Sequence, residues 1–228
     1  MQVMDITFVS SFSTAIITAI VSIYLFRLWY KQSSRMYTDL PLMFSLSFLA
    51  TAINMFLNAA PVLLQIEYTY FLFQIRAFFI CLSVIPMLGM VLHIWLPRFA
   101  KWHIRIMVII AAYWTAVTLL APDEGTLMAF AIPVILAFTL SLIATFVITW
   151  YTGRLKEVRS DLLVFGLGLA FVSQALRVTL LNAGLSVVGD VLNLFGLAAV
   201  SLALVNPWYK QENRPREASL AELEATTY

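Results

Sequence analysis

Three ionisable residues, Arg76, Arg177 and Asp190, lie inside long hydrophobic segments of the sequence. An ionised side chain within hydrocarbon is costly, so each of the three needs a structural or a functional explanation. Arginine presents a planar fork of N–H donors that pairs with carboxylate or phosphate oxygens through two hydrogen bonds. The three residues therefore predict either a salt bridge between helices or a site for an anionic group, such as a carboxylate or a lipid phosphate.

Four amide side chains accompany these charges within the hydrophobic segments. Spacings of three or four residues place each amide on one helix face with another polar residue. Together with the charged residues they form a candidate ligand-binding layer, which comprises Arg76, Arg177, Asp190, Asn193, Gln174, Asn54 and Asn58.

No pattern typical of a catalytic centre accompanies this layer. Paired carboxylates at acid–base spacing, a zinc-binding His-Glu-x-x-His motif and a glycine-rich phosphate loop are all absent from the sequence. His93 and His103 flank a turn without further ligand residues, and Cys81 stands alone in an apolar segment. We therefore expect a protein that is not an enzyme, with no cofactor, no metal and no nucleic-acid partner.

The composition indicates the kind of protein in which this layer lies. Of 228 residues, 62% are hydrophobic and 11% are charged, and the mean hydropathy is +0.91. Soluble domains are about half apolar and about a quarter charged, so an ordinary soluble globule is excluded. With 8 Gly, 8 Pro and 1 Cys, collagen-like, disordered and disulfide-rich chains are excluded too. The sequence predicts an integral membrane protein in contact with the lipid bilayer.

Seven segments are long and apolar enough to span a bilayer as helices. A spanning helix needs about 20 mostly apolar residues, because ~30 Å of hydrocarbon is crossed at ~1.5 Å per residue. The predicted spans are 7–27, 40–60, 70–95, 104–121, 127–150, 162–183 and 186–206. We expect an all-α, polytopic bundle of seven transmembrane helices over residues 1–208, followed by a polar tail over 209–228.

The basic residues indicate the orientation of these spans. All but two of the 14 Lys and Arg residues lie in or next to the loops after spans one, three and five, or in the tail. Short loops rich in Lys and Arg stay in the cytoplasm, which predicts an N-terminus outside and a cytoplasmic C-terminus. We expect the plasma membrane of a prokaryote. Arg76, Arg177 and Asp190 then lie in the outer third of the bilayer, on three different helices.

The polar tail contains a possible docking peptide. Ser219 and Glu222 have the spacing of a helix-capping box, and Leu220 and Leu223 would lie on one side of the short helix that follows. A helix of this kind can dock on a cytoplasmic partner protein. The alternative is a frayed chain end without a partner.

The third span resembles part of a known group of sensors. It contains the aromatic-rich stretch Phe-Leu-Phe-Gln-Ile-Arg at 71–76, Pro86 in mid-span, and the turn His-Ile-Trp-Leu-Pro-Arg at 93–98. This pattern is similar to the seven-helix sensor domains at the N-terminus of many prokaryotic histidine kinases and diguanylate cyclases. The resemblance covers most spans in length and rhythm, and implies a sensor-like module. No kinase or cyclase domain follows span seven here, so we expect the output to pass through a separate protein.

These observations favour a sensor- or receptor-like membrane protein that binds a small or lipidic ligand in its outer polar layer. Two alternatives belong to other classes. The chain could be an accessory subunit of a larger membrane complex, with its apolar faces packed on partner proteins. It could also be a small transporter, which the lack of an internal repeat and of an acidic residue near mid-membrane disfavours.

Overall fold

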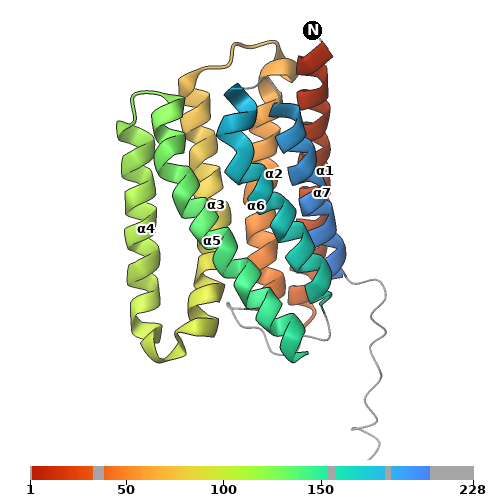
Figure 1. Ribbon diagram of the computed structural model, residues 1–228, viewed down its shortest axis with the longest axis vertical. Coiled ribbons are helices and arrows are strands. Elements are labelled where there is room, and N and C mark those ends of the chain that lie inside the picture. Colours follow the sequence, from red (N-terminus) through yellow and green to blue (C-terminus); the bar gives the residue numbers. More distant parts are fainter. Residues whose placement is uncertain (1, 33–38, 154–157, 183–185, 206–228) are drawn as a thin grey trace, which may run out of the picture.

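The computed structural model describes residues 2–32, 39–153, 158–182 and 186–205, with the side chains of 2–7 and 177–187 outside that description. The described residues form seven α-helices and one 3-10 helix (Figure 1). They are α1 (Gln2–Tyr30), α2 (Leu40–Leu64), α3 (Tyr70–Trp95), η1 (Pro97–Phe99), α4 (Ala100–Leu120), α5 (Glu124–Thr152), α6 (Ser160–Asn182) and α7 (Ser186–Val205).

Each predicted span corresponds to one of these α-helices, which confirms the all-α prediction. Six helices, all but α6, contain a stretch long and apolar enough to cross a bilayer. In α6 the apolar stretch of the described residues, Ser160–Leu176, is shorter. Several helices begin or end outside the apolar segment because interfacial residues continue the helix: α5, for example, begins at Glu124 rather than at 127. The chain is an integral membrane protein, and the seventh span and the orientation stay predictions.

Six of the helices form a closed ring. Each packs on the next, α1 on α2, α2 on α3, α3 on α5, α5 on α6 and α6 on α7, and α7 packs back on α1. Helix α4 lies outside the ring, against α3 and α5 (Figure 1). Short connections make consecutive helices antiparallel neighbours. The α1–α7 contact brings the first and last helices together and gives the bundle an interior.

Serine hydroxyls connect helices within the ring. Ser22 and Ser45 donate to each other's backbone carbonyl oxygens at 2.8 and 2.9 Å, which holds α1 close to α2. Ser173 Oγ of α6 donates to the carbonyl oxygen of Gly189 in α7 at 2.8 Å. Polar contacts between membrane helices contribute about 0.6–2 kcal/mol each. They matter for assembly because apolar helix surfaces gain little free energy when they leave lipid for each other.

Capping fixes where α3 and α5 begin, and α3 carries Arg76. The Thr69 hydroxyl accepts from the backbone N–H of Leu72 at 3.3 Å. The Asp123 carboxylate accepts from the backbone N–H of Thr126 at 2.9 Å and from its hydroxyl at 2.8 Å. These hydrogen bonds lower the pKa of Asp123, because they favour its ionised form. Both helices therefore begin at defined residues.

Two glycines bring α6 and α7 into backbone contact. A Cβ atom placed on Gly166 would lie 2.6 Å from the Gly196 carbonyl oxygen, and one on Gly196 would lie 2.7 Å from the Gly166 carbonyl oxygen. Both obstacles are backbone atoms, which cannot rotate away. Small residues of this kind let membrane helices approach closely, so the α6–α7 contact depends on the absence of side chains at 166 and 196.

We predict that Gly166→Ala separates α6 from α7 and lowers the free energy of unfolding by about 1–3 kcal/mol, the range for overpacked interiors. Gly168→Ala is the matched control, because a Cβ there meets nothing within 4 Å. Unfolding by titration with denaturing detergent measures both variants. Equal stability of the two variants would contradict a backbone contact at Gly166.

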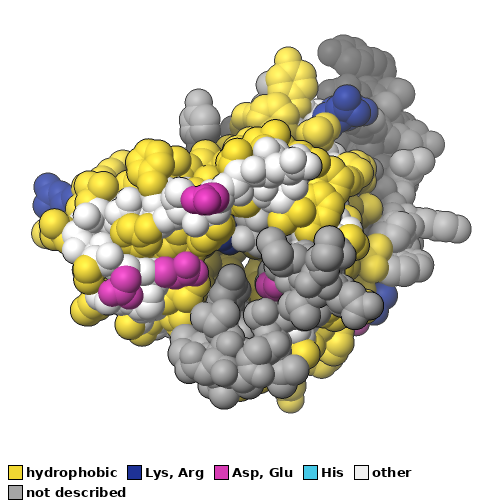
Figure 2. Space-filling view, turned by 90° about the horizontal axis from the view of Figure 1, so that it is seen from above, with side chains coloured by type: hydrophobic (Ala, Val, Ile, Leu, Met, Phe, Trp, Pro, Cys, Tyr) yellow, Lys and Arg dark blue, Asp and Glu magenta, His cyan; other side chains and the backbone are white. Residues whose placement is uncertain are grey.

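The two ends of the bundle differ in charge. One end, called the acidic end below, has Glu67 in the α2–α3 connection, Asp123 in the α4–α5 connection and Glu124 at the start of α5. Figure 2 looks onto this end and shows acidic side chains among hydrophobic and uncharged ones. The opposite end, called the basic end, has Arg27, Lys31, Arg98, Lys101 and Arg159.

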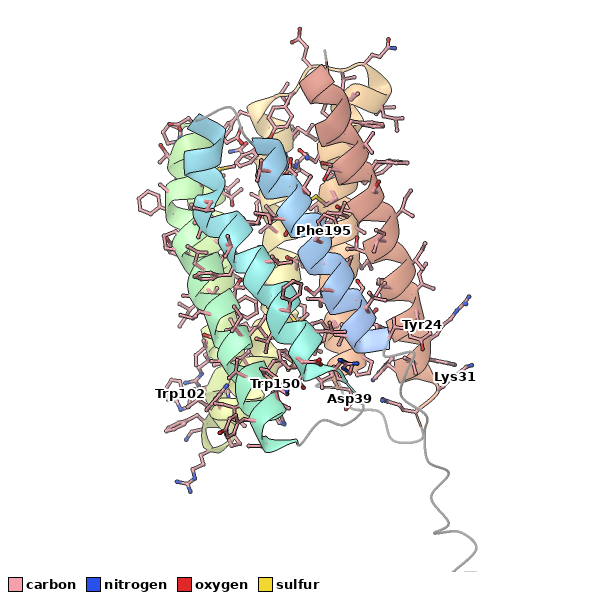
Figure 3. The ribbon with its side chains drawn as sticks, turned by 45° about the vertical axis from the view of Figure 1, so that its right-hand side comes forward. Tyr24, Lys31, Asp39, Trp102, Trp150 and Phe195 are labelled. Carbon is pink, nitrogen blue, oxygen red and sulfur yellow. The ribbon has the colours of Figure 1, made fainter. Side chains whose placement is uncertain are left out.

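Aromatic rings mark the basic end as well. Trp102 and Trp150 come from α4 and α5, and Figure 3 shows both at the lower end of the bundle. Indole rings prefer the membrane–water interface, so these positions agree with the boundary expected from the basic residues.

We predict that the acidic end faces outward. In a Cys81→Ser background, a membrane-impermeant maleimide applied to intact cells should label Glu67→Cys and should label Lys101→Cys only after lysis. Both positions are exposed, so access to the reagent depends on the side of the membrane. The opposite labelling pattern would mean that the orientation expected from the basic residues is wrong.

Candidate functional site

A cavity of about 200 Å³ lies between the helices of the ring and is lined by residues of α2, α3, α5, α6 and α7. Apolar side chains form most of its wall. Its polar lining consists of Ser47, Thr51, Asn54, Ser83, Thr139, Gln174 and Asn193. We call it the central cavity. An apolar cavity of about 150 Å³ holds a benzene molecule, so this one has room for a small organic group of similar size.

Aromatic side chains close the central cavity toward the basic end. The rings of Phe44 and Phe146 lie 6.1 Å apart, and Phe48 lies 6.1 Å from Phe44 on the same helix. All three are buried and belong to a core formed by every helix of the ring. The amide side chains that line the cavity, Asn54, Gln174 and Asn193, lie farther from the basic end along their helices than these rings.

A second, smaller cavity of about 50 Å³ adjoins the central one. The two share lining from Asn54 and Gln174, together with apolar residues of α2, α3 and α5. The smaller cavity adds Arg76 and Phe73 from α3 and Trp114 from α4. We call it the arginine cavity. A molecule in the central cavity can therefore extend a polar end toward the arginine.

The Arg76 side chain is 5% exposed, although it carries a full charge. Its Nε donates to Asn54 Oδ1 at 3.3 Å, and its Nη1 donates to the Tyr68 hydroxyl at 2.9 Å. The guanidinium carbon lies 5.9 Å from the centre of the Tyr68 ring and 5.8 Å from that of Phe73. These are cation–π distances, which stabilise a cation removed from water. Three side chains, those of Asn54, Tyr68 and Phe73, thus fix the guanidinium at the edge of the cavity.

Trp114 supports the same region from outside the ring. Its indole nitrogen donates to the carbonyl oxygen of Ala77, one residue after Arg76, at 2.9 Å. Gln74, on the same helix, donates to the carbonyl oxygen of Thr118 at 2.8 Å. Both bonds join α3 to α4, so α4 holds the helix that carries the arginine even though it does not belong to the ring.

The structure brings four of the seven predicted site residues together. Asn54, Arg76 and Gln174 line the arginine cavity, and Asn193 joins Asn54 and Gln174 in the central cavity. Asp190 is partly buried on α7, three residues before Asn193.

The other predicted residues have different positions. The backbone of Arg177 belongs to α6, but its side chain lies outside the described part. Leu220 and Leu223 also lie outside the described residues. The Asn58 amide donates to Ser11 Oγ on α1 at 2.7 Å, and Asn58 is not among the described residues that line either cavity.

Sequence reasoning missed Tyr68, Phe73 and Trp114 as parts of the site. Phe73 lies one helical turn before Arg76, a spacing that could have indicated the ring contact. Tyr68 precedes α3, and Trp114 lies on a different helix, so their roles depend on tertiary contacts. Aromatic residues are also common throughout this chain, with 14% Phe, Trp and Tyr, which leaves little signal for any single one.

The described residues contain no group of three or more His, Cys, Asp or Glu that could hold a metal ion. The rings of His93 and His103 lie 6.3 Å apart near the basic end, and His103 Nε2 lies 2.9 Å from the Leu96 carbonyl oxygen. No family model, curated protein or solved structure matches this chain.

We predict that Asn54 and Arg76 are energetically coupled. A double-mutant cycle with Asn54→Leu and Arg76→Met should give a coupling of about 1 kcal/mol or more, because a buried hydrogen bond to a charged group is lost. Unfolding in denaturing detergent supplies the four free energies.

Asn58→Leu is the control for this cycle, since Asn58 bonds to Ser11 and lies one helical turn from Asn54. Its effect should add to that of Arg76→Met within about 0.5 kcal/mol. A coupling with Arg76 that is the same for both asparagines would contradict the geometry described above.

Proposed function

We propose that this chain is a receptor-like membrane protein that binds a small anionic ligand, or the anionic end of a lipidic one, in the two adjoining cavities. The supporting observation is the buried Arg76 guanidinium, which Asn54, Tyr68 and Phe73 hold at the wall of a cavity with room for a ligand. No reaction is assigned to the site.

The guanidinium favours a carboxylate or phosphate as the bound group. A planar fork of donors matches the two oxygens of a carboxylate, and the pairing is stronger where water is excluded. Gln174 and Asn193 line the cavities on the side opposite α2 and can donate or accept further hydrogen bonds. The largely apolar wall of the central cavity suits the hydrocarbon part of the same molecule.

The central cavity also provides a route from ligand to signal. It is lined by α3 and α5, which contain Pro86 and Pro133 and continue as helices through both prolines. A proline removes one backbone hydrogen bond, so a helix bends more readily there. A ligand that favours one arrangement of these helices shifts the population of conformers, and the change reaches the basic end of α3. A separate protein partner would detect the change, as expected from the resemblance to seven-helix sensor domains.

The alternative of an accessory subunit has one observation in its favour. Among the six ring helices, those on which α4 mainly packs are α3 and α5, and 17% of its most apolar stretch is buried, against 44% for α1 and α2. Large apolar side chains such as Ile104, Ile109 and Leu120 are exposed along it. Either lipid or a partner subunit can cover this face.

We predict that purified protein binds benzoate and that Arg76→Gln weakens binding at least tenfold. Benzoate has the size of the central cavity and the charge that Arg76 favours, whereas benzamide has the same shape without the charge. Isothermal titration in detergent gives the dissociation constants, and benzamide should bind more weakly than benzoate.

Arg98→Gln is the matched control, because Arg98 is exposed at the basic end. It removes the same charge and should leave benzoate binding unchanged. Thermal unfolding of Arg76→Gln and of Arg76→Lys shows whether each is folded. Benzoate binding that is equal in the folded Arg76→Gln variant and in the original protein would refute the proposed site.

A further inference from the structure

A second recess lies on the outer surface of the bundle, where α1 meets α2, and shares no lining residue with the two cavities described above. Its volume is about 810 Å³, and its accessible wall is almost entirely apolar. Ile23 and Phe26 of α1 form one side, and Leu46 and Leu49 of α2 form the other. All four side chains are exposed. We call this recess the α1–α2 groove.

Small residues form the floor of the α1–α2 groove. Ser22 and Ser45 line it, and they are the pair whose reciprocal hydrogen bonds hold the two helices together. Their hydroxyls are thus satisfied within the protein and offer little polarity to an occupant. A close helix contact with small side chains between larger ones leaves an elongated, apolar channel on the surface.

Two cations line the groove at the basic end. Arg27 and Lys31 are four residues apart on α1, so they lie on the same helix face. Both are exposed, and Figure 3 shows Lys31 pointing away from the bundle. Neither forms an ion pair with any residue that the structure describes, and the described lining of the groove contains no Asp or Glu. The groove therefore combines an apolar channel with a positively charged end.

The α1 side of the groove, from the Ser22–Ser45 contact to the basic end, is about as long as one leaflet of a bilayer is thick. From Ser22 to Lys31 the helix rises roughly 14 Å at ~1.5 Å per residue. Half of a ~30 Å hydrocarbon layer is about 15 Å. An acyl chain that lies along the groove would therefore have its headgroup at the level of the two cations.

We propose that the α1–α2 groove binds one anionic phospholipid of the leaflet at the basic end. One acyl chain packs against Ile23, Phe26, Leu46 and Leu49, and the phosphate lies between Arg27 and Lys31. Basic pockets between membrane helices recognise anionic headgroups in this manner. A zwitterionic phospholipid offers the same chains without the net negative charge, so the groove discriminates by headgroup. This site is independent of the proposed function of the central cavity.

Native mass spectrometry of delipidated protein tests the proposal, with equal amounts of dioleoyl phosphatidylglycerol and dioleoyl phosphatidylcholine in the detergent. One phosphatidylglycerol should be retained at least fivefold more than phosphatidylcholine. The double variant Arg27→Gln/Lys31→Gln should lose this preference. The control Arg98→Gln/Lys101→Gln removes two exposed cations from the same end, outside the groove, and should keep it.

Leu46→Trp tests the apolar part of the groove, since the larger ring fills the channel without changing charge. It should reduce phosphatidylglycerol retention, and excess glycerol 3-phosphate should not displace the lipid. The proposal is wrong if both double variants lose the preference equally, because retention then reflects overall charge. It is also wrong if Arg27→Gln/Lys31→Gln and Leu46→Trp retain phosphatidylglycerol as the original protein does. Displacement of the lipid by glycerol 3-phosphate would likewise contradict it, because it would indicate a site for free phosphate.

Discussion

Within hydrocarbon no water is available to satisfy a polar group, so a buried donor or acceptor without a partner inside the protein is costly. This constraint accounts for the contacts that assemble the ring. Ser22 pairs with Ser45 between α1 and α2, and Ser173 bonds to a carbonyl oxygen of α7. Where side chains are absent, as at Gly166, backbones approach directly. The helices are held by specific contacts because transfer out of lipid supplies little driving force of its own.

The same constraint makes Arg76 the most informative residue of the chain. A guanidinium that is 5% exposed requires an oriented environment, which Asn54, Tyr68 and the ring of Phe73 provide. The guanidinium and the cavities are adjacent, because Asn54 accepts a hydrogen bond from Arg76 and also lines both cavities. A rigidly held charge beside an apolar space is the arrangement by which proteins bind the acidic end of a small apolar molecule. The α1–α2 groove repeats the combination of cation and apolar channel on the lipid-facing surface.

Much of the fold follows from the sequence, because a bilayer permits few solutions for an apolar chain. Helix positions were predictable from the length of each apolar run. The ring of six helices was not predictable, since no local pattern in the sequence indicates that α7 packs on α1 or that α4 lies outside the ring. The site shows the same limit. The spacing of Asn54 and Asn58 places them on one face of α2. In the structure, however, Asn54 accepts a hydrogen bond from Arg76, whereas Asn58, one turn further along, donates to Ser11. Tyr68 and Trp114 join only through tertiary contacts.

Native mass spectrometry of the chain extracted gently from its own membrane tests the central claim, that Arg76 and the adjoining cavities hold an anionic ligand. We expect the chain alone, or as a homodimer, to carry a bound small acidic molecule that is missing from folded Arg76→Gln protein. Stoichiometric foreign subunits without such a molecule would contradict this account. They would make the chain a structural component of a larger complex, in which the polar layer around Arg76 only joins helices.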